Sequence, residues 1–389
     1  MQEDLERPVP LSEIALQWGR IGTVGFGGPP AHVTLLRELC VERRRWLGDR
    51  QFEDAIAATN LLPGPASTQL AIYCAWRLRG AAGAVLGGLC FIGPGLVLIL
   101  ALAALFLSGT PPAWLRGAGA GAGAAVAVVA IDAGLRLLVP TWRRMGARQR
   151  PRMVAYAALG AASAALLGPW LVLVLLGCGA AELIGRRTGP GARLGALHPG
   201  ALLLAAGGVA SAGGLGALSW TALKVGALSY GGGFVIIPLM QADAVRHGWM
   251  TDGEFLNAVA LGQVTPGPVT HTVAVVGYAA AALPGGLLAA ALAFLPSFAF
   301  ILVGADRFDR LIAAPGARAF LDGAGPAAVG AILGSAIPLA RALDEPWQGA
   351  VLAGAAVLMF AARRGVVSTL LAAGAAGAAV GLLGGPLPL

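Results

Sequence analysis

The sequence predicts an all-α polytopic membrane protein with two inverted-topology repeats that contain re-entrant or broken helices. Three observations lead to this prediction: an apolar composition, a motif that occurs twice, and the distribution of arginine. Of the 389 residues, 57% are hydrophobic and 12% are charged, and the mean hydropathy is +0.76. Soluble domains carry about 25% charged residues. Runs such as 82–108 are long enough to cross a bilayer core, which takes about 20 residues.

The net charge of +8 comes almost entirely from arginine, because Lys224 is the only lysine. The arginines lie in short loops between apolar segments, a pattern that indicates membrane orientation rather than a nucleic-acid partner. The first six residues are acidic where a signal peptide would be basic, so we expect no cleaved signal. The four cysteines are scattered without metal-ligand spacing, so we predict neither a disulfide nor a metal site.

A Pro-Gly-Pro motif interrupts an apolar run at residues 63–65 and again at residues 266–268. Proline removes a backbone donor and clashes with the preceding turn, so neither run can be one continuous helix. Backbone groups freed in lipid are costly unless protein buries them or they line a polar cavity. Two broken helices in matching positions of two halves therefore indicate the binding site of a transporter.

The similarity between the two halves extends beyond this motif. The matched positions include Arg20 with Lys224, Phe26-Gly27-Gly28 with Tyr230-Gly231-Gly232, and Pro94 with Pro296. We predict an N-terminal transmembrane repeat at 1–193 and an inverted C-terminal repeat at 194–389, with the boundary in a basic turn.

The arginines indicate how the two repeats are oriented. Loop 37–50 holds five arginines, whereas the matching loop 239–252 holds only Arg246. Conversely, 305–318 holds three arginines where the first repeat has only Arg116. Because cytoplasmic loops concentrate arginine and lysine, equivalent loops face opposite sides of the membrane, and the repeats are inverted.

The same rule predicts re-entrant segments. Loops 37–50 and 136–152 are both rich in arginine, so an even number of crossings separates them. Two clear spans lie between these loops, so segment 52–78 must enter the membrane and return, with the first Pro-Gly-Pro at its tip. By the mirrored argument, 255–280 enters from the outside. The remaining spans are predicted at 82–108, 112–138, 152–168, 170–185, 200–217, 285–304, 319–340, 347–362 and 366–384.

The two motifs suit an anion. A helix that starts after each break would direct its free N–H groups and its positive dipole end into the cavity, and the hydroxyls of Ser67, Thr68, Thr270 and Thr272 can donate as well. A helix kink or an extramembrane turn is the alternative for either motif alone. The candidate substrate-binding residues are Arg20, Gly27, Gly28, Asn60, Pro63, Gly64, Pro65, Ser67, Thr68, Gln69, Lys224, Tyr230, Gly231, Gly232, Gln263, Pro266, Gly267, Pro268, Thr270 and His271.

Arg20 and Lys224 precede the glycine-rich breaks by about two turns, and a symmetric pair of cations there would suit a dianion. The alternative is that each side chain extends to the membrane surface. That alternative is stronger for Arg20, since Lys224 lies well inside an apolar stretch. His271 follows the second motif and is a residue type that titrates near neutral pH.

Three other patterns have structural interpretations. Residues 251–254, Thr-Asp-Gly-Glu, are typical of a capping box. Asp132 and Arg136 are spaced as an i,i+4 ion pair on a helix. The alternating glycines and alanines of 117–123 form a small-residue face that lets helices approach closely, and such faces also allow a homodimer.

Together, several segments resemble one known family. They are Phe-Gly-Gly-Pro at 26–29, Arg-Arg-Arg-Trp-Leu at 43–47, Leu-Leu-Pro-Gly-Pro-Ala-Ser-Thr-Gln at 61–69, Gly-Gly-Gly-Phe at 231–234 and Gln-Val-Thr-Pro-Gly-Pro at 263–268. As a set they resemble the chromate ion transporter family in its long two-repeat form. The resemblance implies a carrier in the bacterial inner membrane that exports chromate and gives resistance, with sulfate as the look-alike anion.

The predicted function is therefore secondary active export of a tetrahedral oxyanion, bound between two re-entrant hairpins, with one half rocking against the other. A dianion leaving a cell with a negative interior gains about 4–5 kcal/mol per 100 mV. The nearest alternative is a carrier for sulfate or another oxyanion, and a passive anion channel also stays open. The sequence has no catalytic triad, metal cluster or cofactor fingerprint, so we predict neither an enzyme nor a cofactor.

Overall fold

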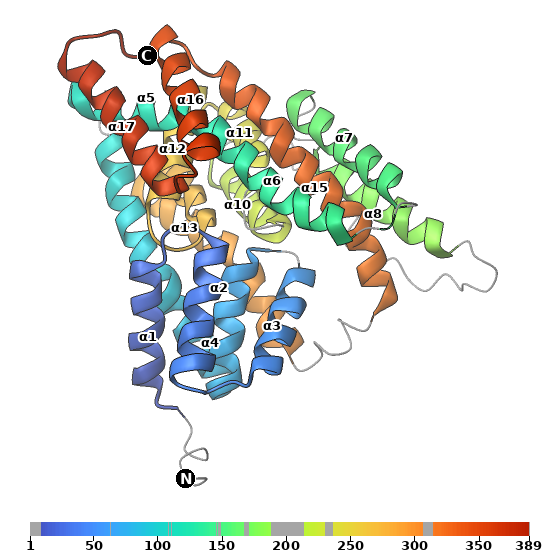
Figure 1. Ribbon diagram of the computed structural model, residues 1–389. Helices are drawn as coiled ribbons and strands as arrows, with labels where there is room; N and C mark the ends of the chain where they lie inside the picture. Colours follow the sequence, from blue (N-terminus) through green and yellow to red (C-terminus); the bar gives the residue numbers. More distant parts are fainter. Residues whose placement is uncertain are drawn as a thin grey trace.

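The computed structural model describes residues 9–62, 64–107, 109, 111–144, 146, 149–166, 171–187, 214–229, 236–305 and 314–388. Within these ranges the chain forms helices and no strand, which confirms the predicted all-α fold (Figure 1). In the same ranges, the stretches long and apolar enough to cross a membrane are Ala66–Phe106, Ala113–Arg143, Val269–Gly304 and Pro315–Arg341.

The first repeat contains the predicted break at the Pro-Gly-Pro motif. Its first helices are α1 (Leu11–Val24), α2 (Pro29–Arg37), the π-helical turn η2 (Glu38–Arg43), α3 (Asp49–Leu61) and α4 (Ala66–Phe106). α3 ends where Leu62 becomes extended, and α4 begins directly after Pro65. Between them Gly64 has a φ of 124°, a conformation that favours glycine.

α4 folds back on itself at Arg79 and Gly80, whose dihedral angles are not helical. A Cβ at Gly87 would lie 2.5 Å from the Cβ of Ala75, so the two limbs of α4 pack closely against each other. The chain therefore enters along α3, turns at the motif, returns along the first limb of α4, and turns again into a long helix. This is the helix–break–helix arrangement predicted for 52–78.

The second repeat follows the same path. Its corresponding elements are α10 (Leu215–Leu228), α11 (Ile236–Arg246), α12 (Asp252–Val264), the 3-10 turn η4 (Val269–His271) and α13 (Thr272–Gly304). α12 begins with the predicted capping box, in which the Glu254 N–H donates to Thr251 Oγ1 at 3.2 Å. α13 folds back at Ala281 and Ala282, as α4 does at Arg79 and Gly80.

The two repeats also share their closest helix contacts. In the first repeat, a Cβ at Gly22 of α1 would collide with the carbonyl oxygen of Phe91 in α4. In the second, a Cβ at Gly226 of α10 would collide with the carbonyl oxygen of Ala293 in α13. Glycine at these two matched positions lets each first helix lie against the long limb of its own hairpin.

The remaining helices interlock the two repeats. They are α5 (Ala113–Ala124), α6 (Val126–Arg144), α7 (Arg150–Leu166), α8 (Leu171–Arg187), α15 (Pro315–Arg341), α16 (Pro346–Ala356), the π-helical turn η6 (Val357–Ala361) and α17 (Val366–Leu382). α5 of the first repeat packs on α17 of the second, and α15 of the second packs on α6, α7 and α8 of the first (Figure 1).

Small residues make these contacts close. Gly121 of α5 has a Cβ position 2.9 Å from the backbone of Gly377 in α17, so the predicted small-residue face 117–123 packs within the chain. A rocking motion of one sequence half against the other as rigid bodies would have to break this contact and the contacts of α15. The predicted i,i+4 pair is also present, with Arg136 Nε 2.6 Å from Asp132 Oδ2.

The predicted spans at 152–168, 170–185, 319–340, 347–362 and 366–384 correspond to helical segments of the structure. The predicted span 200–217 falls almost wholly outside the described residues, as does the predicted boundary between residues 193 and 194. That division of the chain stays a prediction.

Candidate functional site

The two Pro-Gly-Pro tips each lie against the opposite repeat. At the second tip, the Gly267 N–H donates to the carbonyl oxygen of Gly25, at the end of α1, at 2.9 Å. A Cβ at Gly95 of α4 would collide with the carbonyl oxygen of Pro266. At the first tip, the Cβ position of Gly64 is 3.4 Å from the carbonyl oxygen of Gly226 in α10. The site is therefore built jointly by both repeats.

A chain of hydrogen bonds connects the two tips through His32 of α2. His32 Nε2 lies 3.0 Å from the carbonyl oxygen of Gly25, the group that also accepts from Gly267. His32 Nδ1 lies 3.2 Å from Ser67 Oγ, in the first turn after the first tip. The His32 ring is fully buried and packs edge-on against Phe91.

Sequence reasoning did not single out His32. The available signal was its place three residues after the Gly28-Pro29 break, in a segment that is otherwise mostly apolar. Its two partners could not be predicted, because Gly25 and Ser67 come from other segments.

Several side chains near the tips have a buried polar atom without a hydrogen-bond partner among the described residues. Each has a polar atom shielded from solvent and belongs to a segment next to one of the breaks or to the helices that pack on them. They are Thr68, Ser229, Gln263, Thr270, His271 and Ser297. Buried polar groups are normally hydrogen-bonded, since an unpaired one costs free energy. A concentration of such groups is therefore typical of a place where a polar ligand or water binds.

His271 is one of these residues, and both of its ring nitrogens are buried without a hydrogen-bond partner among the described residues. Its ring is fully buried, lies against the Cβ position of Gly95, and packs edge-on against Phe294 at 5.4 Å between ring centroids. The carbonyl groups of Ile92 and Pro266 face the ring, but neither meets hydrogen-bond geometry. Thr270 beside it is also fully buried. Both residues lie within three positions after the second Pro-Gly-Pro.

The predicted pair of cations is arranged differently in the two repeats. Arg20 is exposed on α1 and makes no ion pair within the described part of the chain. Lys224 forms an ion pair with Asp243 of α11, and the two side chains are only 10% and 9% exposed. Thr221 Oγ1 donates to the same Asp243 carboxylate at 3.0 Å. The Lys224 charge is therefore neutralised within the protein.

Asp243 was not predicted from the sequence. The available signal was a lone carboxylate within the apolar segment that becomes α11, where an ionisable residue is unusual and needs a partner. Among the other predicted residues, Gly28, Pro65, Gln69 and the second tip are buried, whereas Gly27 and Asn60 are exposed. Pro63, Tyr230, Gly231 and Gly232 lie outside the described residues.

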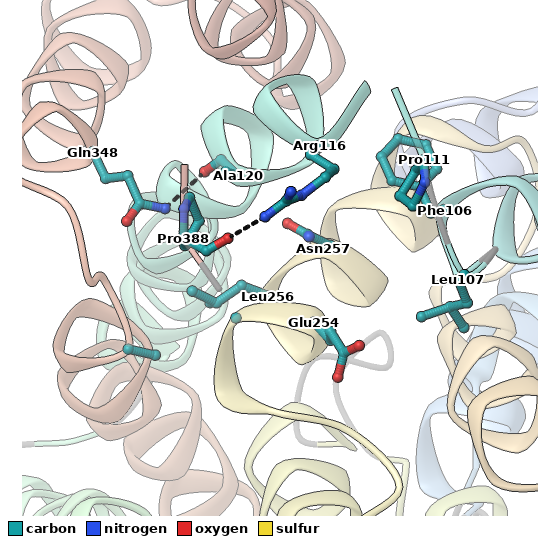
Figure 2. Close-up of a pocket in the computed structure, with 13 residues that line it drawn as sticks. Phe106, Leu107, Pro111, Arg116, Ala120, Glu254, Leu256, Asn257, Gln348 and Pro388 are labelled. Atoms are coloured by element: carbon teal, nitrogen blue, oxygen red, sulfur yellow. Dashed lines mark hydrogen bonds between the residues drawn. The ribbon is translucent and has the colours of Figure 1, made fainter. Parts of the chain in front are cut away.

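A separate cavity of about 340 Å³ lies at the opposite end of α12 from the second tip (Figure 2). Arg116 extends into it and donates to the carbonyl oxygen of Pro388 at 3.1 Å. Asn257 and Glu254 of α12 line the same cavity, and the buried Asn257 Oδ1 has no hydrogen-bond partner in the described part of the chain. This cavity was not predicted as a site.

In a comparison with known proteins, one family model matches the chain twice, once in each repeat. The family described as chromate transporter matches residues 12–183 and again residues 216–381. The chain is 31% identical to a chromate transport protein of Cupriavidus metallidurans, covering 97% of this chain and 94% of that protein. It is also 31% identical to a chromate transport protein of Pseudomonas aeruginosa, covering 88% and 84%. An uncharacterized transporter of Methanocaldococcus jannaschii is 25% identical over 77% and 76%. No solved structure matches.

Proposed function

Because this chain belongs to the chromate transporter family, we propose that it is a secondary active transporter that exports chromate across the bacterial inner membrane and so confers resistance. One observation carries the proposal: the two Pro-Gly-Pro breaks lie against opposite repeats, and buried polar side chains without partners lie beside them. The proposed cargo site lies between the two tips.

The proposed site binds an oxyanion mainly through neutral donors. Thr68 and Thr270 are the first choice, because each is fully buried, follows one of the tips and has an unpaired hydroxyl within the described structure. The first turn of α4 adds backbone N–H groups and the positive end of a helix dipole. Release of the oxyanion from such a site costs less free energy than release from a site with two cations. A carrier needs this, because it must release its cargo in every cycle.

The same donors explain why sulfate is the alternative cargo. Hydroxyl and backbone N–H groups recognise the oxygens of a tetrahedral dianion, whatever its central atom. The direction of transport follows from charge: export of a dianion down a membrane potential of 100 mV releases about 4–5 kcal/mol. Export therefore needs little further coupling, whereas uptake would need a co-transported cation.

The test uses purified protein in liposomes with an imposed membrane potential, and measures chromate flux with and without sulfate. We expect saturable chromate transport in the direction that the potential drives. Thr68→Val and Thr270→Val keep the side-chain volume but remove a donor, so each should raise the half-saturation concentration by about tenfold, as loss of one hydrogen bond to a charged group does.

Thr34→Val is the matched control, since the Thr34 hydroxyl bonds to the backbone of its own helix on an exposed surface. Chromate transport without any effect of the two variants would reject the site between the tips. Transport of sulfate but not of chromate would reject the cargo and keep the oxyanion site.

A further inference from the structure

We propose that His32 is a positioning residue that holds the two Pro-Gly-Pro tips as one binding unit and turns the Ser67 hydroxyl away from the cargo. This inference rests on the proposed oxyanion site between the tips. His32 belongs to neither motif, but its ring bonds to Ser67, two residues after the first motif, and to the Gly25 carbonyl that accepts from Gly267 of the second motif.

The proton positions follow from the partners of the His32 ring. The Gly25 carbonyl oxygen can only accept, so His32 Nε2, 3.0 Å away, must carry a proton and donate it. An unpaired charge is costly to bury, so the fully buried ring is neutral. In a neutral imidazole the other nitrogen, Nδ1, is then an acceptor. Ser67 Oγ, 3.2 Å from Nδ1, must therefore donate its only hydroxyl proton to His32.

This assignment changes the role of Ser67. Its hydroxyl proton is already used, so Ser67 offers only lone pairs to anything between the tips. An oxyanion needs donors, and the neighbouring hydroxyls of Thr68 and Thr270 have no partner among the described residues. Because of His32, the two adjacent hydroxyls after the first tip have different roles. The Ser67 hydroxyl bonds to the protein, and the Thr68 hydroxyl is available to the cargo.

The other side of the ring fixes the second tip. The Gly25 carbonyl accepts from both His32 Nε2 and the Gly267 N–H. One residue thereby connects Ser67, after the first tip, with Gly267, in the second. The matching position in the second repeat is Ile236, a fully buried apolar side chain that can make no such link. The connection is made only once in the described structure, from the first repeat.

Two substitutions separate the two sides of the ring. His32→Gln places an amide N–H near the position of Nε2, so it can keep the bond to Gly25 but loses the acceptor for Ser67. His32→Asn places an amide oxygen near the position of Nδ1, so it can keep the bond from Ser67 but does not reach Gly25. Ser67→Ala removes the Ser67 side of the link alone.

Chromate transport in liposomes is measured for each variant, with half-saturation concentration and maximal rate determined separately. We expect His32→Gln and Ser67→Ala each to raise the half-saturation concentration about fivefold, and the double variant to be no worse than either single variant. His32→Asn combined with Ser67→Ala should be worse than Ser67→Ala alone. His247→Gln is the matched control, because His247 is an exposed residue at the end of α11.

Multiplied effects of His32→Gln and Ser67→Ala, or an unchanged half-saturation concentration in both, would overturn the proposal while wild-type transport still supported the oxyanion site. A second measurement does not depend on transport. The ring nitrogen signals of 15N-histidine-labelled protein, assigned by their loss in His32→Gln, should show a protonated Nε2 and an unprotonated Nδ1 at neutral pH. The opposite tautomer would overturn the proposal whatever the protein transports.

Discussion

The helix that leads to the first Pro-Gly-Pro is exposed along one face, from Asp49 to Asn60, whereas its counterpart α12 is almost entirely buried from Phe255 to Gln263. α3 packs mainly on α4, but α12 contacts α5, α11, α13 and α17. In Figure 1, α3 lies at the edge of the lower group of helices and α12 lies within the upper group. The two copies of the motif therefore follow the same chain path but lie in different surroundings.

The difference shows that the repeat fixes the path of each hairpin but not its packing. The second hairpin is supported on several sides by helices of both repeats, so it has little room to move. The first hairpin has fewer neighbours, and we expect it to be the more mobile of the two. Substitutions in the two repeats should therefore have unequal effects. Two comparisons between the repeats and one within α4 test this.

The largest expected effect is at the buried ion pair, which occurs only in the second repeat within the described residues. Asp243→Asn leaves the Lys224 ammonium group unpaired in an apolar region, and breaking a buried pair costs about 3–5 kcal/mol of stability. Arg20→Gln, at the position that matches Lys224, should change stability by no more than about 0.5 kcal/mol, because Arg20 is exposed. Thermal unfolding in detergent measures both.

The double variant Asp243→Asn with Lys224→Gln decides what Lys224 does. Without a buried charge, most of the lost stability should return. We expect this double variant to transport chromate, because Asp243 already neutralises Lys224 in the native protein. A stable double variant that binds no oxyanion would instead make Lys224 a ligand, as its position in the sequence first indicated.

The second pair tests the contact between α4 and the second tip. Gly95→Val would drive a side chain into the Pro266 carbonyl and the His271 ring, and overpacking of this kind costs about 1–3 kcal/mol. Because the collision displaces the tip, we expect transport to fall by about 5- to 150-fold at normal expression, the range to which about 1–3 kcal/mol corresponds at about 1.36 kcal/mol per factor of ten. Gly93→Val is the matched control on the same helix, since no atom lies within 4 Å of its Cβ position. Equal activity of the two variants would show that the tip does not depend on this contact.

Much of this architecture was predictable because it depends on local chemistry. The Pro-Gly-Pro motifs break a helix because two prolines and a glycine act together, whereas single prolines such as Pro94 and Pro296 lie inside α4 and α13. Thr251 and Glu254 form a capping box from their own spacing. The partners of His32 and Lys224 were not predictable. Gly25 lies seven residues from His32 and Ser67 lies 35 residues away, so these contacts exist only after several helices have packed. The interlocking of α5 with α17 escaped prediction for the same reason.

The smallest effect is expected where each hairpin turns into its long helix. In the first repeat Gly80 has a φ of 56°, and in the second Ala282 has a φ of 50°. Glycine adopts this conformation freely, but a residue with a Cβ is strained there by about 1–3 kcal/mol. Glycine also has more freedom to lose on folding, which offsets about 0.5–1 kcal/mol. Ala282→Gly should therefore stabilise the protein by about 1 kcal/mol.

Gly80→Ala should destabilise the protein by a similar amount, and backbone strain is the cause, since no atom lies within 4 Å of the added Cβ. Thermal unfolding of the two variants, measured side by side, compares the two turns directly. If Ala282→Gly lowers the unfolding midpoint, the exposed turn at Ala282 is not strained, although the two limbs of α13 pack closely against each other. If the unfolding midpoint rises in Ala282→Gly and falls in Gly80→Ala, the more tightly packed second hairpin is the one with the strained turn. Its many contacts then maintain a backbone conformation that alanine would otherwise avoid.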